Sequence, residues 1–266
     1  MSGTVYLVGA GPGAADLLTL RAARLLGDAD IVFYDALVPD EVLFLSKNSI
    51  KVKVGKRSGR LSTAQNFINK QLADAARKYK VVVRLKGGDP MLFGRAHEEI
   101  AYLEKQRIRV EVVPGVTAAL AASAELGVSL TRRGLSRSVV FLTPRRGAGE
   151  RPNEWVRAAL AADTVAIYMG AGEAKAISSA LLEAGKPGAT PVVMVENASL
   201  ADARRLFGTL GTLESVAAKS SGGPALILLG EVYRASAIID AWRDAQSFSS
   251  PTVRATRTGR ARSSSS

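Results

Sequence analysis

The sequence predicts an α/β fold made of two domains that follow one another along the chain. In the first half, runs of β-branched residues end in Gly, Asp or Pro and lead into amphipathic segments, the pattern of βα units around a parallel sheet. A second series of such units follows the arginine-rich connection TRRGLSR at 131–137. We expect an N-terminal domain over 1–131, a C-terminal domain over 136–245 and a tail over 246–266.

Each element of the first domain is predicted from its hydrophobic spacing, with period 2 for strands and 3.6 for helices. The expected strands are 4–8, 31–34, 50–54, 81–85 and 110–113. The expected helices are 15–26, 63–79, 98–105 and 117–126.

The second domain repeats this alternation, with one exception. Its expected strands are 138–142, 164–168, 191–195, 206–209 and 225–229, and its expected helices are 152–161, 174–184, 213–219 and 235–244. No stretch long enough for a crossover helix precedes the segment RLFGTLG at 205–211, so we expect an antiparallel pair there.

Composition excludes several classes of site and compartment. The chain has no cysteine and a single histidine, His97, which argues against zinc fingers, iron–sulfur clusters, thiol nucleophiles and disulfide frameworks. His97 itself is expected on the surface of a helix. The amino terminus MSGTVYLVGAGPG lacks a basic region before an apolar stretch, and no segment reaches the roughly 18 apolar residues of a membrane span. We expect a cytoplasmic protein without a membrane partner.

The net charge of +12 is unevenly placed. The tail after Gln246 carries four arginines and no acid, so it contributes +4, and its Ser, Thr, Arg and Gly content predicts disorder. The tail is either a solubilising appendage or a nucleic-acid arm. Aromatic residues make up only 6% of the chain and no RNA-binding module is recognisable, which argues against RNA binding or modification.

The first expected strand runs into Gly9-Ala10-Gly11-Pro12-Gly13-Ala14. This turn satisfies G-x-G-x-x-G/A, and Asp35 after the second strand could stand for the acid that binds a ribose, so a nicotinamide dinucleotide is one interpretation. Pro12 removes a backbone donor that a pyrophosphate would use, which favours a less anionic ligand. A tight turn that serves only packing is the third interpretation.

A second glycine cluster, Lys86-Gly87-Gly88-Asp89-Pro90, follows the apolar run 81–85. Ligands of open α/β sheets bind beyond the carboxyl ends of the strands, so both glycine loops are expected at one rim. Asp89 could bind a hydroxyl or an ammonium group. Gly-Asp-Pro is also an ordinary turn sequence, and this alternative stays open.

Six ordered segments of the chain carry a family resemblance: VYLVGAGPG, FYDALV, VGKRSG, VVRLKGGDPMLFGR, VVPGVTAA and PALILLGEV. Between about residues 5 and 232 the chain resembles the uroporphyrinogen-III C-methyltransferases, a branch of the tetrapyrrole methylases. The GKR segment with Gln65, and LKGGDP followed by FGR, are similar to this branch in particular. The resemblance implies two α/β domains with S-adenosylmethionine in the cleft between them, usually in a homodimer.

The resemblance also implies an activity, with S-adenosylhomocysteine as the product of the cofactor and no metal. Uroporphyrinogen III would be methylated twice to precorrin-2, which feeds sirohaem, cobalamin and haem d1. The alternative is methylation of a later precorrin. The chain is too short to add the dehydrogenase–chelatase module of fused sirohaem synthases, so we expect it only to methylate.

Carried over by position, the family's site residues fall into three groups. The implied cofactor site is Pro12, Gly87, Gly88, Asp89, Leu92, Thr117, Ala118, Met169 and Ala198, with Ala225 nearby. The implied acid–base pair is Asp35 and Lys56, although an Asp at the end of a strand is often a helix cap and a surface Lys is usually solvated. The implied groups for the carboxylates of the substrate are Arg57, Arg95 and Arg133. Glu98 could bind a pyrrole N–H or a proton, or it could be an exposed acid in the first turn of a helix.

The chain departs from the family pattern in segments expected to face the substrate. Leu61 stands where His is common, Arg132 replaces the His of LTHR, and Thr143-Pro144-Arg145 replaces TGH. His97 lies where Gly is usual. Arginine keeps affinity for carboxylates but does not titrate near neutral pH, so the pH profile of the substrate site is expected to differ.

Overall fold

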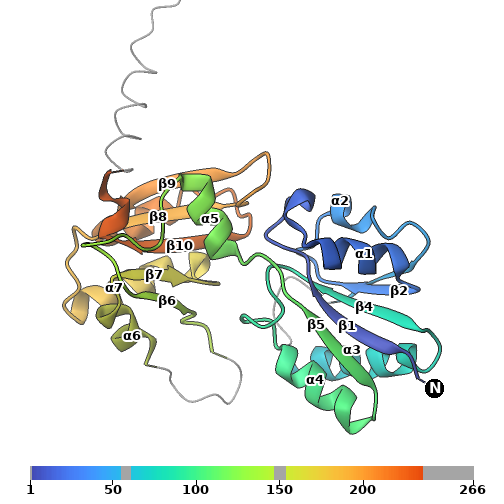
Figure 1. Ribbon diagram of the computed structural model, residues 1–266. Coiled ribbons are helices and arrows are strands. Elements are labelled where there is room, and N and C mark those ends of the chain that lie inside the picture. Colours follow the sequence, from blue (N-terminus) through green and yellow to red (C-terminus); the bar gives the residue numbers. More distant parts are fainter. Residues whose placement is uncertain (1, 55–60, 147–153, 236–266) are drawn as a thin grey trace, which may run out of the picture.

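A computed structural model describes residues 2–54, 61–146 and 154–235, although the side chains of 61–64 lie outside this description. Two five-stranded sheets organise these residues, and they lie side by side (Figure 1). This is the two-domain α/β architecture that the alternation of strands and helices predicts.

The first sheet is fully parallel. Its strands are β1 (Thr4–Gly9), β2 (Ile31–Tyr34), β3 (Ile50–Lys53), β4 (Val81–Lys86) and β5 (Arg109–Val113), in the order β3-β2-β4-β1-β5. All five carboxyl ends therefore meet at one rim, where the glycine loops after β1 and β4 emerge. The strand predictions for this domain are confirmed to within about a residue at each end.

Helices cover both faces of the first sheet, as a parallel sheet requires. On one face α1 (Leu20–Asp28) and α2 (Asp40–Leu43) pack over Val8, Val83 and Leu85. On the other face, α3 (Leu61–Ala76) and α4 (Ala96–Lys105) pack over Val5, Leu7 and Val82. Because side chains alternate along a strand, Arg84 and Lys86 lie on the same face as Val82, the α3–α4 face.

The second sheet is mixed. Its strands are β6 (Val139–Leu142), β7 (Thr164–Ile167), β8 (Pro191–Glu196), β9 (Arg204–Thr209) and β10 (Ala225–Gly230), in the order β6-β7-β10-β8-β9. Only β6 and β7 are parallel, whereas β10 is antiparallel to both of its neighbours. The antiparallel pair predicted around RLFGTLG is confirmed as β8 and β9.

The second sheet is also covered on both faces. Three helices, α6 (Trp155–Ala161), α7 (Ala174–Glu183) and α8 (Leu213–Ala217), pack on one face around Ile167, Val192 and Ile227. On the other face, α5 (Ala118–Leu126) packs through Ala119 and Ala122 against Ala166, Val193 and Leu228. Although α5 precedes residue 131 in sequence, it therefore packs with the second sheet (Figure 1).

The predicted helix over 15–26 is wrong in one respect, because the structure divides it in two. A short 3-10 turn, Ala15–Leu17, precedes α1. Thr19 is extended and its hydroxyl accepts the backbone N–H of Ala22 at 3.1 Å, which makes Thr19 the N-cap of a new helix. The short helix α2 is not predicted, and the helix expected over 235–244 lies almost wholly outside the described residues.

Over the described ranges, no helix has both the length and the apolar character needed to cross a membrane.

Candidate functional site

The two glycine loops are joined by backbone hydrogen bonds at the rim of the first sheet. The N–H of Gly88 donates to the carbonyl of Gly11 at 2.7 Å, and the N–H of Gly11 donates back to Gly88 at 3.2 Å. Both glycines have left-handed backbone, with φ of 73° at Gly11 and 67° at Gly88. The predicted convergence of the loops is confirmed.

Two further glycines, Gly9 and Gly115, lie where three chain segments approach too closely for a side chain. A Cβ on Gly9 would lie 2.7 Å from the Cα of Gly115 and from the carbonyl of Gly88, and a Cβ on Gly115 would lie 2.4 Å from that carbonyl. These neighbours are backbone atoms that cannot move aside. The loops after β1, β4 and β5 are therefore packed together without side chains between them.

Open space remains on one side of this packed core. A Cβ on Gly88 would have only the Cα of Thr117 within reach, at 4.0 Å. The loop thus leaves open space beside Gly88, in the region where the cofactor is predicted. Gly87 is tighter, since its Cβ would lie 3.1 Å from that of Leu37.

Asp89 braces the loop that carries it. One carboxylate oxygen accepts the N–H of Gly115 at 2.9 Å, and the other accepts the N–H of Met91 at 2.8 Å. The side chain therefore ties the β4 loop to the β5 loop. Contact of Asp89 with a ligand stays a prediction, and the bracing role is the one the structure describes.

Residues of the second domain complete the region opposite the glycine loops. The hydroxyl groups of Tyr168 and Thr117 lie 2.7 Å apart, and the N–H of Ala119 donates to Tyr168 at 3.1 Å. Tyr168 thereby satisfies a free N–H at the start of α5. Its ring lies 5.1 Å from the ring of Phe93, measured between centroids, so an aromatic contact joins the two domains. Burial raises the pKa of Tyr168, which keeps the hydroxyl protonated.

Five residues other than glycine adopt left-handed backbone around this region. They lie in the segment after β4 and in the loops after β7 and β8: Phe93, Arg95, Met169, Asn197 and Ser199. Such conformations cost about 1–3 kcal/mol each and cluster at binding sites, where the surrounding structure holds them. Met169 is 44% exposed and Ala198 is buried. The Oγ of Ser199 accepts the N–H of Ala14 at 3.1 Å, which ties the loop after β8 to the first glycine loop.

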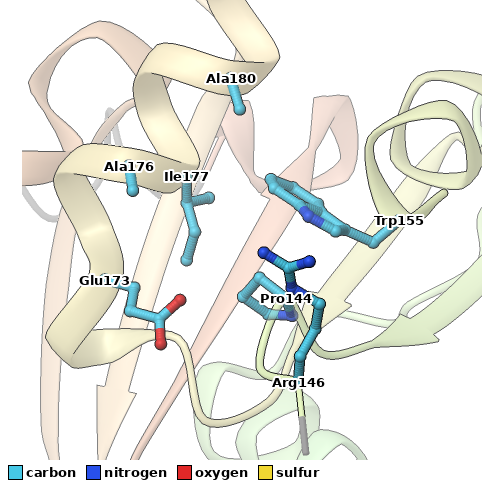
Figure 2. Close-up of a pocket in the computed structure, with 7 residues that line it drawn as sticks. All are labelled: Pro144, Arg146, Trp155, Glu173, Ala176, Ile177 and Ala180. Carbon is cyan, nitrogen blue, oxygen red and sulfur yellow. The ribbon is translucent and has the colours of Figure 1, made fainter. Parts of the chain in front are cut away.

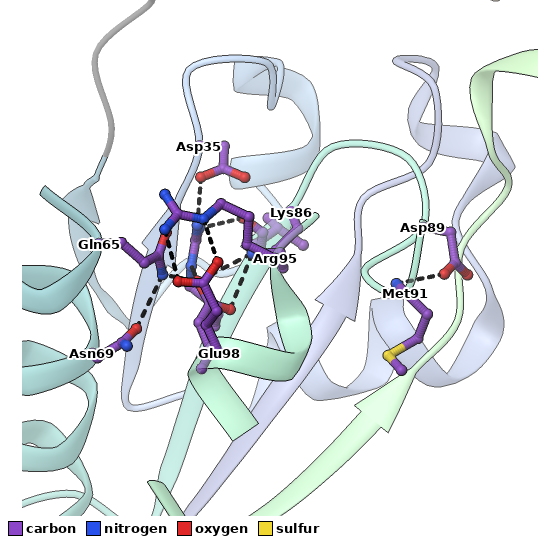
Figure 3. A network of polar contacts seen from close by, with 11 residues as sticks. Asp35, Gln65, Asn69, Lys86, Asp89, Met91, Arg95 and Glu98 are labelled. Carbon is purple, nitrogen blue, oxygen red and sulfur yellow. Dashed lines mark hydrogen bonds and ion pairs between the residues drawn. The ribbon is translucent and has the colours of Figure 1, made fainter. Parts of the chain in front are cut away.

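Behind the rim lies a buried network of charged groups (Figure 3). The guanidinium of Arg84 donates to Asp35 at 2.6 Å and to Glu99 at 3.1 Å. The ammonium of Lys86 donates to both oxygens of Glu99, at 3.0 and 3.1 Å. Gln65 of α3 adds a third donor to Glu99 at 3.0 Å.

The network perturbs the ionisation of its cations. Burial lowers the pKa of Lys86, and the neighbouring Arg84 adds to this effect, while Glu99 opposes it. Burial would also lower the pKa of Arg84, but the attraction of Asp35 and Glu99 outweighs it and raises that pKa. With Asp35 29% exposed, the network reaches from the protein interior to the rim.

The structure describes some of the predicted catalytic and substrate-binding residues, and others lie outside it. Arg95 and Glu98 form a two-point ion pair with distances of 2.7 Å, and this bond lowers the pKa of Glu98. Both side chains are more than a third exposed. Arg133 lies in an exposed turn closed by Arg132 and Ser136, away from the contacts of the glycine loops that the structure records. Lys56 and Arg57 lie outside the described residues.

The other predicted cofactor residues lie in loops and at the starts of elements. Pro12, Leu92, Ala118 and Ala225 are partly buried, in the first glycine loop, the β4 loop, the start of α5 and the start of β10. His97 is exposed on α4, as predicted. Among the residues that the structure describes, no cluster of three potential metal ligands occurs.

A separate hollow of about 290 Å³ lies between α6 and α7, on the face of the second sheet that these helices cover (Figure 2). Trp155 of α6 and Ile177 of α7 supply apolar lining, and Arg146 and Glu173 supply charged groups. Pro144, one of the departures from the family pattern, also lines it. None of the predicted cofactor residues contributes to this hollow.

Sequence analysis missed three residues that organise the site. Tyr168 could have been found as the polar aromatic residue directly before Met169. Arg84 and Glu99 carry a weaker signal: a charge inside the apolar run VVVRLK, and the second acid of the pair after FGR. Neither pattern reveals that the two side chains meet.

Comparisons with known proteins identify the family. The sequence profile of the Tetrapyrrole (Corrin/Porphyrin) Methylases matches residues 4–214, which span both glycine loops. The chain belongs to this family. The tetrapyrrole methylase is 43% identical over 235 residues to the uroporphyrinogen-III C-methyltransferase of Pseudomonas aeruginosa, a match that covers 88% of this chain and 96% of that protein.

One further relative is a longer protein, and another has a known crystal structure. Siroheme synthase 1 of Cronobacter sakazakii is 45% identical over 231 residues, 86% of this chain, and the chain spans about half (49%) of that relative's length. The crystal structure of Uroporphyrin-III C-methyl transferase from Thermus thermophilus, complexed with S-adenyl homocysteine, superposes with a TM-score of 0.77 at 40% identity. It covers 88% of this tetrapyrrole methylase and 94% of the Thermus chain.

Proposed function

We propose that the protein transfers methyl groups from S-adenosylmethionine to two carbons of uroporphyrinogen III and so forms precorrin-2. The observation that carries the proposal is the pair of joined glycine loops, which leave open space beside Gly88 opposite the second domain. The names of the Pseudomonas and Thermus relatives support the substrate and the cofactor.

The cofactor fits the residues around this space. The N–H and carbonyl of Gly88 are bonded to Gly11, so this glycine offers an adenosine space rather than hydrogen bonds, while Met169 and Leu92 supply apolar contact. S-adenosylmethionine would supply an electrophilic methyl group on a sulfonium. The protein's part is to hold that group in line with a pyrrole carbon, because positioning accounts for much of the acceleration.

Proton handling falls to Asp35 in this proposal. The alkylated macrocycle must lose a proton, and the partly exposed carboxylate of Asp35 at the rim can accept it. Lys56 is proposed as the proton donor. Arg95, Arg57 and Arg133 are proposed to bind the carboxylates of the substrate, which suit guanidinium groups, and Glu98 is proposed to bind a pyrrole N–H or a proton.

The proposal extends to the assembly and the compartment. A homodimer is the state that the family resemblance implies, and exposed apolar side chains such as Leu20 and Phe44 offer surface for a second copy. We place the protein in the cytoplasm. Sedimentation velocity of the purified chain tests the dimer, and cell fractionation tests the compartment.

Incubation with isotopically labelled S-adenosylmethionine and uroporphyrinogen III, followed by mass analysis, tests the activity. The proposal predicts a product with two added methyl groups. A parallel reaction with a late precorrin serves as the comparison. Methylation of the late precorrin alone would assign the enzyme to a later step and overturn the proposed substrate.

A further inference from the structure

Glu99 of α4 joins the two parts of the rim that the reaction would use. Its side chain is fully buried, and a single oxygen, Oε1, accepts from Gln65, Arg84 and Lys86 at 3.0 to 3.1 Å. These donors belong to α3 and β4. One carboxylate therefore ties together two helices and the central strand that carries the GGDP loop.

The first arm of this network leads to Asp35. The guanidinium of Arg84 is held at three nitrogens: Nε donates to Glu99, Nη1 to the carbonyl of Leu85 and Nη2 to Asp35. Because a guanidinium is planar and rigid, fixing two of these bonds fixes the direction of the third. The position of the Asp35 carboxylate therefore depends on a residue that lies behind the rim.

The second arm leads to the segment that presents Phe93, Arg95 and Glu98. The stem of Lys86 passes beneath this segment, where a Cβ on Gly94 would lie 3.2 Å from its Cε and 2.5 Å from the carbonyl of Pro90. Phe93 and Arg95 on either side of Gly94 are left-handed, with φ of 53° and 56°. A backbone of this kind keeps its shape only where its surroundings hold it.

The buried charges of this network add little net stability to the fold. Arg84 and Glu99 are 3% and 0% exposed, and burying such charges costs as much as their attraction returns, so apolar residues of similar volume are often at least as stable. Two cations, Arg84 and Lys86, are balanced by two carboxylates, Glu99 and Asp35, one of which belongs to the proposed reaction. A role in function accounts for an arrangement that packing does not favour.

We propose that Glu99 is a positioning residue, which fixes the Asp35 carboxylate through Arg84 and the Phe93–Glu98 segment through Lys86. This inference rests on the proposed methyl transfer, because it assigns Asp35 a place in that reaction. Glu99 itself lies behind the rim and is not expected to touch the substrate. Its effect is therefore on turnover rather than on affinity for the cofactor.

Glu99→Gln tests the proposal, since it keeps the shape of the side chain and removes its charge. Misplacement of a reacting group by about 1 Å can cost 10²-fold, so we expect kcat to fall by about that factor while the Kd for S-adenosylhomocysteine stays at the wild-type value. Glu104→Gln, an exposed acid on the same helix, is the matched control and should leave kcat unchanged. Wild-type kcat in a folded Glu99→Gln variant would overturn the proposal.

The double variant Glu99→Gln with Lys86→Met separates positioning from stability, because it removes one charge of each sign. We expect its melting temperature to recover toward wild type while kcat stays low. The double variant also tests the positioning role if Glu99→Gln alone fails to fold. Recovery of kcat together with melting temperature would show that Glu99 acts only on stability.

A crystal structure of Glu99→Gln keeps this inference separate from the proposed activity. The expected result is a displaced Asp35 carboxylate and loss of its 2.6 Å contact with Arg84. An unmoved Asp35 would contradict the inference whatever the enzyme methylates. Absence of wild-type turnover with uroporphyrinogen III would instead contradict the proposed function.

Discussion

The two sheets contribute different kinds of group to the site. The parallel sheet brings charged side chains to its rim: Asp35 and the Arg95–Glu98 pair. The mixed sheet brings uncharged side chains, those of Tyr168, Met169 and Ser199, on the loops after β7 and β8. The difference follows from topology, because all strands of a parallel sheet end at one rim, whereas β10 runs against its neighbours.

Each domain also contains a buried carboxylate, and the two have different partners. Glu99 binds Arg84 and Lys86, which lead to the rim. Glu196, at the end of β8, binds the hydroxyl of Ser220, the N–H groups of Ser221 and Gly222, and Arg204. Glu99 is therefore connected to the site, whereas Glu196 holds a surface loop. We infer that chemistry belongs to the first domain, while the second shapes the cofactor's surroundings.

Gly88→Leu is expected to have the largest effect, because the side chain would fill the space beside the loop. We predict complete loss of S-adenosylhomocysteine binding in calorimetry. Gly127→Leu is the matched control: Gly127 has nearly the same backbone, with φ of 64° against 67°, and open space around it, so both variants bear the same strain. Equal loss in both variants would show that strain, not the ligand space, is responsible.

Asp35→Asn is expected to lower kcat by about 10²-fold, the usual contribution of a general base, with cofactor affinity unchanged. Asp30→Asn is the control at the opposite end of β2, where the carboxylate accepts backbone N–H groups of Lys80 and Val81. It should lower stability and leave kcat near wild type. If Asp35→Asn turns over normally with the wild-type pH profile, the division of roles between the two sheets fails.

Arg133→Leu tests whether the connection between the two domains binds the substrate. If its guanidinium binds a carboxylate of the substrate, losing about 1.5–3 kcal/mol should raise KM roughly 10- to 150-fold where KM reflects binding. Affinity for S-adenosylhomocysteine should not change. Arg137→Leu, an exposed arginine in the same connection, is the control. Equal damage to substrate and cofactor binding would indicate a structural role at the junction instead.

Glu196→Gln is expected to affect stability. Burial alone would raise the pKa of Glu196, but hydrogen bonds from Ser220 and Ser221 outweigh it and lower the pKa. A carboxylate with a depressed folded-state pKa adds stability above its unfolded pKa, near 4.3, and loses it as pH falls through the folded value. Urea unfolding should therefore show a deficit of about 1.5–3 kcal/mol at pH 7 that shrinks below pH about 4. A deficit independent of pH would contradict this origin.

Much of the fold could be predicted because the strands are encoded locally. Runs such as VVVRLK and ALILLG contain β-branched and apolar residues bounded by turn signals, and they became β4 and β10. The break at Thr19 was missed because the amphipathic spacing continues through the cap. The position of α5 was not predictable from its place in the sequence, because its alanines fit either sheet and long-range packing decides.

The site was predictable where it consists of loops and not where it consists of contacts. Glycine loops at strand ends can be recognised in the sequence, and the family resemblance added residues such as Met169 to the predicted site. The meeting of Arg84 with Glu99, or of Thr117 with Tyr168, depends on side chains 15 and 51 positions apart. No local pattern encodes such a distance, and only the folded rim brings these groups together.

A crystal structure with bound S-adenosylhomocysteine would show whether both domains share the cofactor. We expect the ligand to contact the backbone of Gly88 on one side and Met169 on the other. A ligand bound only to one domain, or held in the hollow beside Trp155 and Ile177, would contradict this expectation.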